Sequence, residues 1–104
     1  MDLQQLTREF EQIALANDWQ ALHTAKNLAA AVSVEAAELL AEFQWLSDQQ
    51  AEALAADSEA RRRVGEEVAD VLLYLLALCR RLDLDLLEVA GDKMAKNRRR
   101  LLSP

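Results

Sequence analysis

The sequence is poor in the residues that interrupt helices. Its 104 residues include 2 Gly and 1 Pro, and that proline is the last residue, Pro104. Glycine and proline are the residues that most disfavour helix interiors, whereas Ala, Leu, Glu, Gln and Arg, all abundant here, favour them. This composition predicts an all-α fold. The length predicts one domain over residues 1–104, since compact domains usually contain about 100 residues or more.

Cysteine and long apolar segments are also scarce. A single cysteine, Cys79, excludes a disulfide within the chain and favours a reducing compartment. The first residues lack the basic start and apolar core of a signal peptide, so a cytoplasmic location is expected. The longest stretch without a charged residue covers residues 71–79, far short of the roughly 20 residues that cross a bilayer. No membrane span is therefore expected.

Positive charge is in the minority, with 12 Lys and Arg against 18 Asp and Glu, a net charge of −6. A chain of this charge should have no general attraction to a nucleic-acid polymer. Basic residues nevertheless gather near the C-terminus. Two interpretations stay open for them: a contact with a small anionic ligand, or a solvated basic helix end, which is commoner. The residues are Lys93, Lys96, Arg98, Arg99 and Arg100.

The chain should contain four main helices. Apolar residues recurring at spacings of three and four predict a first amphipathic helix over residues 2–16. A turn-prone stretch predicts a loop over residues 17–25, with Thr24 as a candidate N-cap for the next helix. Further helices are expected over residues 26–46, 59–82 and 85–99. Ser47 or Asp48 should cap a short, weaker helical segment through Ala55, Asp57 or Ser58 should cap the helix over residues 59–82, and Asp85 should start the last helix.

The third of these helices is apolar on every side over residues 71–79. A helix in a small monomeric bundle could hardly hide such a surface from water. Small domains also bury a limited share of their surface. We therefore expect a homodimer or a higher homo-oligomer that shares this helix.

Four carboxylates form two pairs with helical spacing. Glu35 and Glu38 are three residues apart, as are Glu67 and Asp70, so each pair should point along one face of its helix. If the two helices pack antiparallel, all four groups can meet. Like charges in a partly buried site raise one another's pKa, and a bound cation resolves that conflict. Oxygen ligands without paired Cys or His favour Mg²⁺ or Mn²⁺ over Zn²⁺.

The simpler interpretation is that these are surface acids paired with Lys or Arg on the same helix. Against it, no basic residue follows any of the four by three or four positions. A di-iron bundle is set aside, because it needs Glu-x-x-His pairs and the one histidine, His23, does not follow a Glu at that spacing. A non-catalytic helical dimerisation or regulatory module remains the alternative.

The sequences at residues 35–38, E-A-A-E, and at residues 67–70, E-V-A-D, resemble the E-x-x-E … E-x-x-D signature of the MazG-like, all-α nucleoside triphosphate pyrophosphohydrolases. The similarity extends over about residues 17–100 and is greatest to the dCTP pyrophosphatase branch. Further segments carry it: Asp18-Trp19, His23, Asn27-Leu28, residues 42–45, residues 70–75 and residues 93–100. The chain departs from the family at Val34 and Ala37, where relatives often have Glu or Gly, and in having its next acid at Glu42.

The resemblance implies a four-helix bundle that assembles as a homodimer or homotetramer. It also implies cleavage of a (deoxy)nucleoside triphosphate, in particular a dCTP-like pyrimidine, to the monophosphate and pyrophosphate. It implies Mg²⁺ binding by Glu35, Glu38, Glu67 and Asp70, with Glu38 orienting or deprotonating the attacking water. It implies phosphate binding by Lys93, Lys96, Asn97 and Arg98. It implies base binding by Trp19, His23, Asn27, Trp45 and Tyr74. The alternative is core packing for the two tryptophans and Tyr74, and a loop residue with its hydrogen bonds satisfied for His23.

Overall fold

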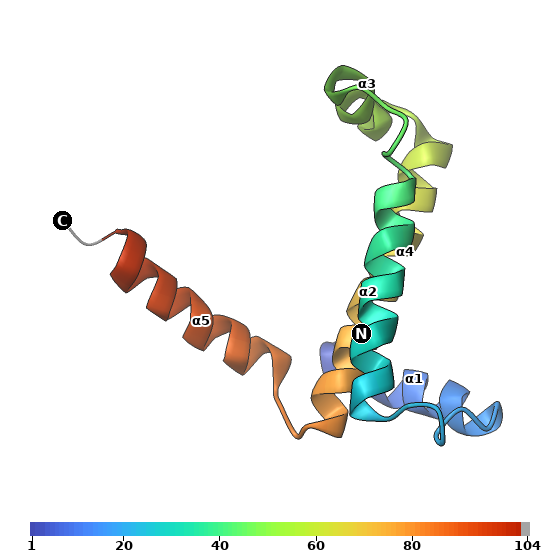
Figure 1. Ribbon diagram of the computed structural model, residues 1–104, viewed down its shortest axis with the longest axis vertical. Coiled ribbons are helices and arrows are strands. Elements are labelled where there is room, and N and C mark those ends of the chain that lie inside the picture. The colour runs from blue at the N-terminus through green and yellow to red at the C-terminus, as the bar shows by residue number, and fades with distance from the viewer. Residues whose placement is uncertain (103–104) are drawn as a thin grey trace.

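The computed structural model describes residues 1–102, and these residues form helices without strands (Figure 1). Four helices are long. A short helix and a 3₁₀ turn connect the second to the third of them. The elements are α1 (Leu3–Ala16), α2 (Ala25–Ala41), α3 (Asp48–Glu52), η1 (Ala53–Ala56), α4 (Ser58–Arg81) and α5 (Leu86–Leu101). The predicted all-α fold is confirmed, with the helix starts within one residue of the expected ones.

Each α-helix begins after a polar residue whose side chain accepts a hydrogen bond from a backbone N–H of the first turn, which satisfies an otherwise unpaired donor. Thr24 caps α2 through the N–H of Asn27, at 3.2 Å. Ser47 and Gln50 form a reciprocal capping box at α3. The five capping residues are Asp2, Thr24, Ser47, Asp57 and Asp85.

Helices α1 and α4 end in the same kind of turn. Asp18 and Asp83 have positive φ angles of 56° and 55°, a conformation that Asp tolerates better than most residues. After α1, the N–H of Trp19 donates to the carbonyl of Ala14 at 2.8 Å, which is the long hydrogen bond of a Schellman motif. The chain therefore reverses at once, and Trp19 lies against the end of its own helix.

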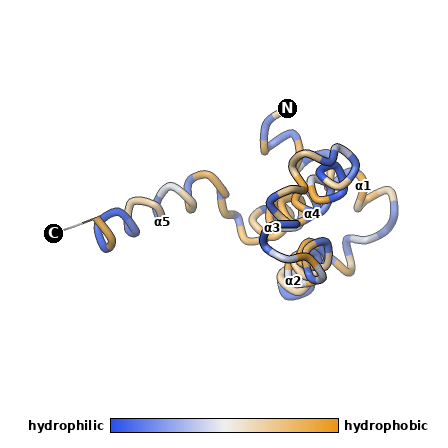
Figure 2. The backbone as a smooth tube through the Cα atoms, turned by 90° about the horizontal axis from the view of Figure 1, so that it is seen from above, coloured by the Kyte–Doolittle hydropathy of each residue, from blue (hydrophilic) through white to orange (hydrophobic). Residues whose placement is uncertain are grey.

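The core lies where α2 and α1 pack on α4. Helices α2 and α4 run antiparallel side by side along most of their length, and α1 crosses the C-terminal half of α4 (Figures 1 and 2). Among residues 1–102, four residues are buried, each with 5 % or less of its surface exposed: Ala14, Leu28, Ala60 and Leu76. The antiparallel pairing is the arrangement that the two carboxylate pairs require.

Helix α2 ends five residues earlier than the periodicity predicts. It stops at Ala41, and residues 42–45 continue as turns. The N–H groups of Glu42 and Phe43 bond back three residues, at 3.2 and 2.9 Å, which tightens the backbone at a helix end. The predicted end at residue 46 was wrong, because no Gly or Pro in the sequence marks the end of the helix at Ala41. The reversal toward α3 and α4 ends the helix.

Helix α5 extends away from the other helices, and it has no packing comparable to that between α2 and α4 (Figure 1). The radius of gyration is 16.6 Å, against about 13 Å for a compact chain of this length. The accessible surface is 8031 Å², roughly 2,000 Å² more than a folded monomer of 11.7 kDa exposes. One chain by itself therefore does not close into a four-helix bundle.

The apolar run at residues 71–79 stays incompletely covered. Leu76 is its one buried residue, and the others keep a larger part of their surface exposed. Burial of apolar side chains is the main favourable term in folding. Covering the exposed parts of residues 71–79 would therefore stabilise the protein further. None of the helices among residues 1–102 has the length and apolar character needed to cross a membrane.

Candidate metal centre and the adjoining aromatic cluster

Helices α2 and α4 bring three of the four predicted carboxylates together. One oxygen each from Glu35, Glu38 and Glu67 lies within 4.8 Å of the others. Asp70 is outside this group of three, yet its charge acts on both Glu35 and Glu67. We call these four residues the carboxylate centre. The carboxylate centre forms because α2 and α4 pack antiparallel. The chain between these two helices contains α3 and η1.

The acids of the carboxylate centre oppose one another's ionisation. The pKa of Glu35 is raised, first by burial, then by a hydrogen bond with Glu38 and by the negative charge of Glu38. Burial is also the largest cause of the raised pKa of Glu67, followed by the charges of Glu38 and Asp70. One oxygen of Glu35 and one of Glu67 are buried without a hydrogen-bond partner in the described chain.

Buried oxygen atoms that accept no hydrogen bond are destabilising unless something else satisfies them. A divalent cation would both ligate these atoms and offset the repulsion. The donors are all carboxylate oxygens, without Cys or His, and such a set favours a hard ion over Zn²⁺ or Cu²⁺. The residues present at the carboxylate centre therefore fit a hard divalent cation.

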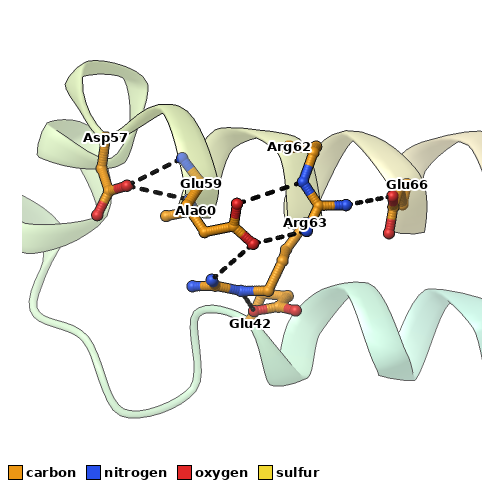
Figure 3. A network of polar contacts seen from close by, with 7 residues as sticks. All are labelled: Glu42, Asp57, Glu59, Ala60, Arg62, Arg63 and Glu66. Atoms are coloured by element: carbon orange, nitrogen blue, oxygen red, sulfur yellow. Dashed lines mark hydrogen bonds and ion pairs between the residues drawn. The ribbon is translucent and has the colours of Figure 1, made fainter.

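Basic residues do not neutralise the carboxylate centre. Arg62 is engaged on the outer side of α4, where it contacts Glu59 at 2.6 Å and Glu66 at 2.5 Å (Figure 3). Arg63 reaches across to Glu42 at the end of α2, at 3.8 Å. Within residues 1–102, no ion pair involves any of the four carboxylates of the centre, which leaves their charge uncompensated.

Aromatic side chains adjoin the carboxylate centre. Tyr74 is one turn after Asp70 on α4, and its ring meets that of Phe10 on α1 edge-on, with centroids 5.2 Å apart. The ring of His23 lies 5.9 Å from Phe10 and 6.2 Å from Tyr74, and Trp19 lies 6.0 Å from His23. We call Phe10, Trp19, His23 and Tyr74 the aromatic cluster.

The aromatic cluster is in electrostatic reach of the acids. The pKa of Tyr74 is raised, first by burial and then by the negative charges of Glu35, Asp70 and Glu38. A hollow of about 600 Å³ is lined by Phe10 and His23 together with residues at the C-terminal end of α4, and none of the four carboxylates lines it. Apolar rings with a few polar groups are typical of a ligand site, and here they border a set of metal-type ligands.

Three of the five predicted base-binding residues belong to the aromatic cluster, and two do not. Trp45 lies on the turn after α2 and is 87 % exposed, without a ring contact to the cluster in the described chain. The side-chain amide of Asn27 donates to the carbonyl of Leu22 at 3.0 Å, so it closes the loop before α2. Phe10 was missed, because its spacing in the first helix indicates only a core position.

The predicted phosphate-binding residues lie together on α5, away from the carboxylate centre of the same chain (Figure 1). Lys93, Lys96 and Arg98 are exposed. Asn97 is half-buried, and its side-chain oxygen has no hydrogen-bond partner among the described residues. Within one chain, the basic residues of α5 and the acids of α2 and α4 are not brought together.

The MazG-like family profile matches residues 30–102, which contain both carboxylate pairs and α5. The chain belongs to the MazG-like family. This match confirms the family resemblance seen in the sequence. The residues that align include the turn after α2, where this chain has Glu42, and the whole of α4.

Individual relatives agree with the family assignment. The chain is 37% identical over 98 residues to mouse dCTP pyrophosphatase 1, and 36% identical to the human protein of the same name. These matches cover 94% of this chain and 58% of each relative's length. A crystal structure of a pyrophosphatase from Archaeoglobus fulgidus superimposes with a TM-score of 0.83 at 38% identity. This match covers 96% of this chain and 92% of the archaeal chain.

Proposed function

We propose that this MazG-like protein is a single-domain, Mg²⁺-dependent nucleoside triphosphate pyrophosphohydrolase, which releases a nucleoside monophosphate and pyrophosphate. One observation carries the proposal: a cluster of unpaired carboxylates adjoins a cluster of aromatic rings. The first suits a cation that binds phosphates, and the second suits a nucleobase. The names of the similar proteins, dCTP pyrophosphatase and pyrophosphatase, support the same activity.

The proposed metal ligands are Glu35, Glu38, Glu67 and Asp70, with Mn²⁺ as a substitute for Mg²⁺. When bound, the cation would neutralise charge on the triphosphate and stabilise the departing pyrophosphate. Glu38 is the exposed member of the group of three, so water can approach its free oxygen. We assign to Glu38 the orientation or deprotonation of the attacking water.

The proposed substrate is a pyrimidine deoxynucleotide of the dCTP type. Trp19, His23 and Tyr74, together with Phe10, offer flat apolar surface and a few hydrogen-bonding groups for a small base. Trp45 is exposed in the single chain, and we propose that it covers the base or contacts a partner subunit. Asn27 acts by holding the loop that carries His23, since its amide is already bonded.

Self-association is part of the proposal. Three features favour association with a second copy of the chain. Helix α5 lacks extensive packing on the other helices, the apolar residues 71–79 are only partly covered, and the accessible surface is roughly 2,000 Å² larger than that of a compact monomer. A homodimer or homotetramer would complete a four-helix bundle. The phosphate-binding residues would then serve the carboxylate centre of the partner, because they lie away from their own (Figure 1). They are Lys93, Lys96, Asn97 and Arg98.

The test is pyrophosphate release from a panel of ribo- and deoxynucleoside triphosphates with Mg²⁺, with EDTA as the matched control. We expect release that EDTA abolishes and that is fastest with dCTP. Silence across the whole panel would favour the alternative, a non-catalytic helical dimerisation or regulatory module.

Mixing two inactive variants tests the sharing of a site between subunits. Glu38→Gln damages the acidic half of a site and Arg98→Ala the basic half. In a mixed oligomer, one site receives both intact halves, so activity should reappear after the variants are denatured and refolded together. Two separately refolded samples, combined afterwards, are the control. Continued inactivity of the refolded mixture would place both halves of each site on one chain.

A further inference from the structure

Arg63 occupies the end of a line of functional side chains on α4. Arg63, Glu67, Asp70 and Tyr74 follow one another at spacings of four, three and four, so they lie along one face of the helix. At a rise of about 1.5 Å per residue, Arg63 is about 10 Å before Asp70 and about 16 Å before Tyr74. A ligand with its base at Tyr74 and its phosphates over the acids would extend toward Arg63.

Arg63 is poorly engaged, in contrast to its neighbour. Its Nε lies 3.8 Å from Glu42 Oε2, and its Nη1 lies 3.8 Å from Glu59 Oε1 (Figure 3). In the described chain no hydrogen bond is formed by this guanidinium, whereas that of Arg62 donates to both Glu59 and Glu66. The side chain of Arg63 is half exposed, so its five N–H donors are available to a ligand.

Negative charge on α2 lies beside Arg63. Glu42 is one turn after Glu38 on α2 and forms its C-cap, and the C-terminal end of a helix carries partial negative charge. Both features hold the guanidinium at the rim of the carboxylate centre. The negative charge of Glu42 is also among the smaller causes of the raised pKa of Glu67, after burial and the charges of Glu38 and Asp70.

We propose that Arg63 binds the β- and γ-phosphates of the substrate, the two that leave as pyrophosphate. This inference rests on the proposed pyrophosphohydrolase function. An Arg fork matches two phosphate oxygens with charge-assisted hydrogen bonds. The ion pairs it would leave are solvent-exposed and contribute little. Arg63 is thus a binding residue that distinguishes a triphosphate from a monophosphate, in addition to the residues of α5.

The test compares Arg63→Gln with Arg62→Gln, a matched change at the adjacent position that faces away from the carboxylate centre. Isothermal titration calorimetry with Mg²⁺ and pyrophosphate gives the affinity, and steady-state assays with dCTP give KM and kcat. We expect Arg63→Gln to weaken pyrophosphate binding about tenfold or more, to raise KM for dCTP, and to leave inhibition by dCMP unchanged. Arg62→Gln should match the wild type, and Arg63→Lys should fall between.

Failure of this inference can be told from failure of the proposed function. If the wild type hydrolyses dCTP but Arg63→Gln binds pyrophosphate normally, the role of Arg63 is wrong and the activity stands. If pyrophosphate binding depends on Arg63 but no triphosphate is hydrolysed, the activity is wrong and the binding role stands. Equal losses in Arg62→Gln and Arg63→Gln, or a wild type that binds no pyrophosphate, would overturn the inference. Circular dichroism of each variant checks that the helices form.

Discussion

Helices α2 and α5 are alike in length and capping but differ in charge and in packing. Helices α2 and α5 have 17 and 16 residues and both begin at a capped residue. Yet α2 packs along α4, and α5 packs on no helix to a comparable extent (Figure 1). The first pair gathers negative charge, whereas α5 ends in positive charge. Under the function proposed above, the comparison teaches that each region supplies one half of a site, the acids from α2 and α4 and the basic residues from α5.

The largest expected effect concerns the acidic half. Glu38→Gln or Asp70→Asn should abolish hydrolysis while helix content stays unchanged, because each change removes charge that the cation needs without altering side-chain shape. Glu66→Gln, an acid on the outer side of α4, is the control and should remain active. Retention of more than about a tenth of kcat/KM, which corresponds to a loss below roughly 1.4 kcal/mol, would contradict the assignment.

The next effect concerns the apolar side of α5. Leu87 is 68 % exposed in the single chain, and burying such a side chain against a partner contributes about 1.5–3 kcal/mol. Leu87→Asp should therefore weaken self-association by more than tenfold and lower activity with it. Asp92→Asn on the same helix is the control. Multi-angle light scattering gives the oligomeric state. A wild type that stays monomeric at micromolar concentration would show that α5 has no partner.

Mg²⁺ binding at the carboxylate centre of α2 and α4 should raise the stability of the folded protein. Mg²⁺ at 100 times its dissociation constant should stabilise the folded protein by about 2.7 kcal/mol, because only the folded chain assembles the carboxylate centre. The melting temperature with and without Mg²⁺ measures this, and Glu67→Gln should reduce the increase. No increase at millimolar Mg²⁺, with or without nucleotide, would favour the non-catalytic module.

Base recognition gives a somewhat smaller effect. If Trp45 stacks on the base or walls it off, Trp45→Ala should lose about 1–3 kcal/mol of affinity, as base stacking does elsewhere. The variant should also discriminate less among dCTP, dTTP, dUTP, dATP and dGTP, as measured by kcat/KM. Unchanged selectivity would assign Trp45 to a subunit contact. Equal wild-type values for dCTP and dATP would remove the pyrimidine preference and leave the pyrophosphohydrolase activity standing.

The smallest effect is on pH dependence. The pKa values of Glu35 and Glu67 are raised above their ordinary value of 4.5 in the folded chain, so the folded state binds more protons than the unfolded state just above that value. Their repulsion is fully present above the folded pKa and disappears as they protonate. Metal-free protein should therefore gain stability from these groups as pH falls through their raised folded-state pKa values toward 4.5. Thermal melts in EDTA of wild type and Glu35→Gln isolate the effect, and identical pH profiles would contradict it.

Much of the candidate site was predictable because its spacing is local. Glu35 and Glu38 share a helix face whatever the helix packs against, and the same holds for Glu67 and Asp70. The caps at Thr24 and Asp85 are equally local, since each involves backbone groups within three residues. Features that depend on a second element were not predictable: the end of α2 at Ala41 is one of them.

The sequence by itself determined that the chain is helical, where most helices begin, and which acids lie on one face, because these follow from propensity, capping and period. Only the tertiary structure decided that Phe10 meets Tyr74, that Asn27 closes a loop, and that Arg63 turns toward Glu42. Those contacts join elements far apart in the chain or depend on the path of a loop. Pattern alone does not fix them, because packing selects one partner for each side chain among many that its helix face could meet.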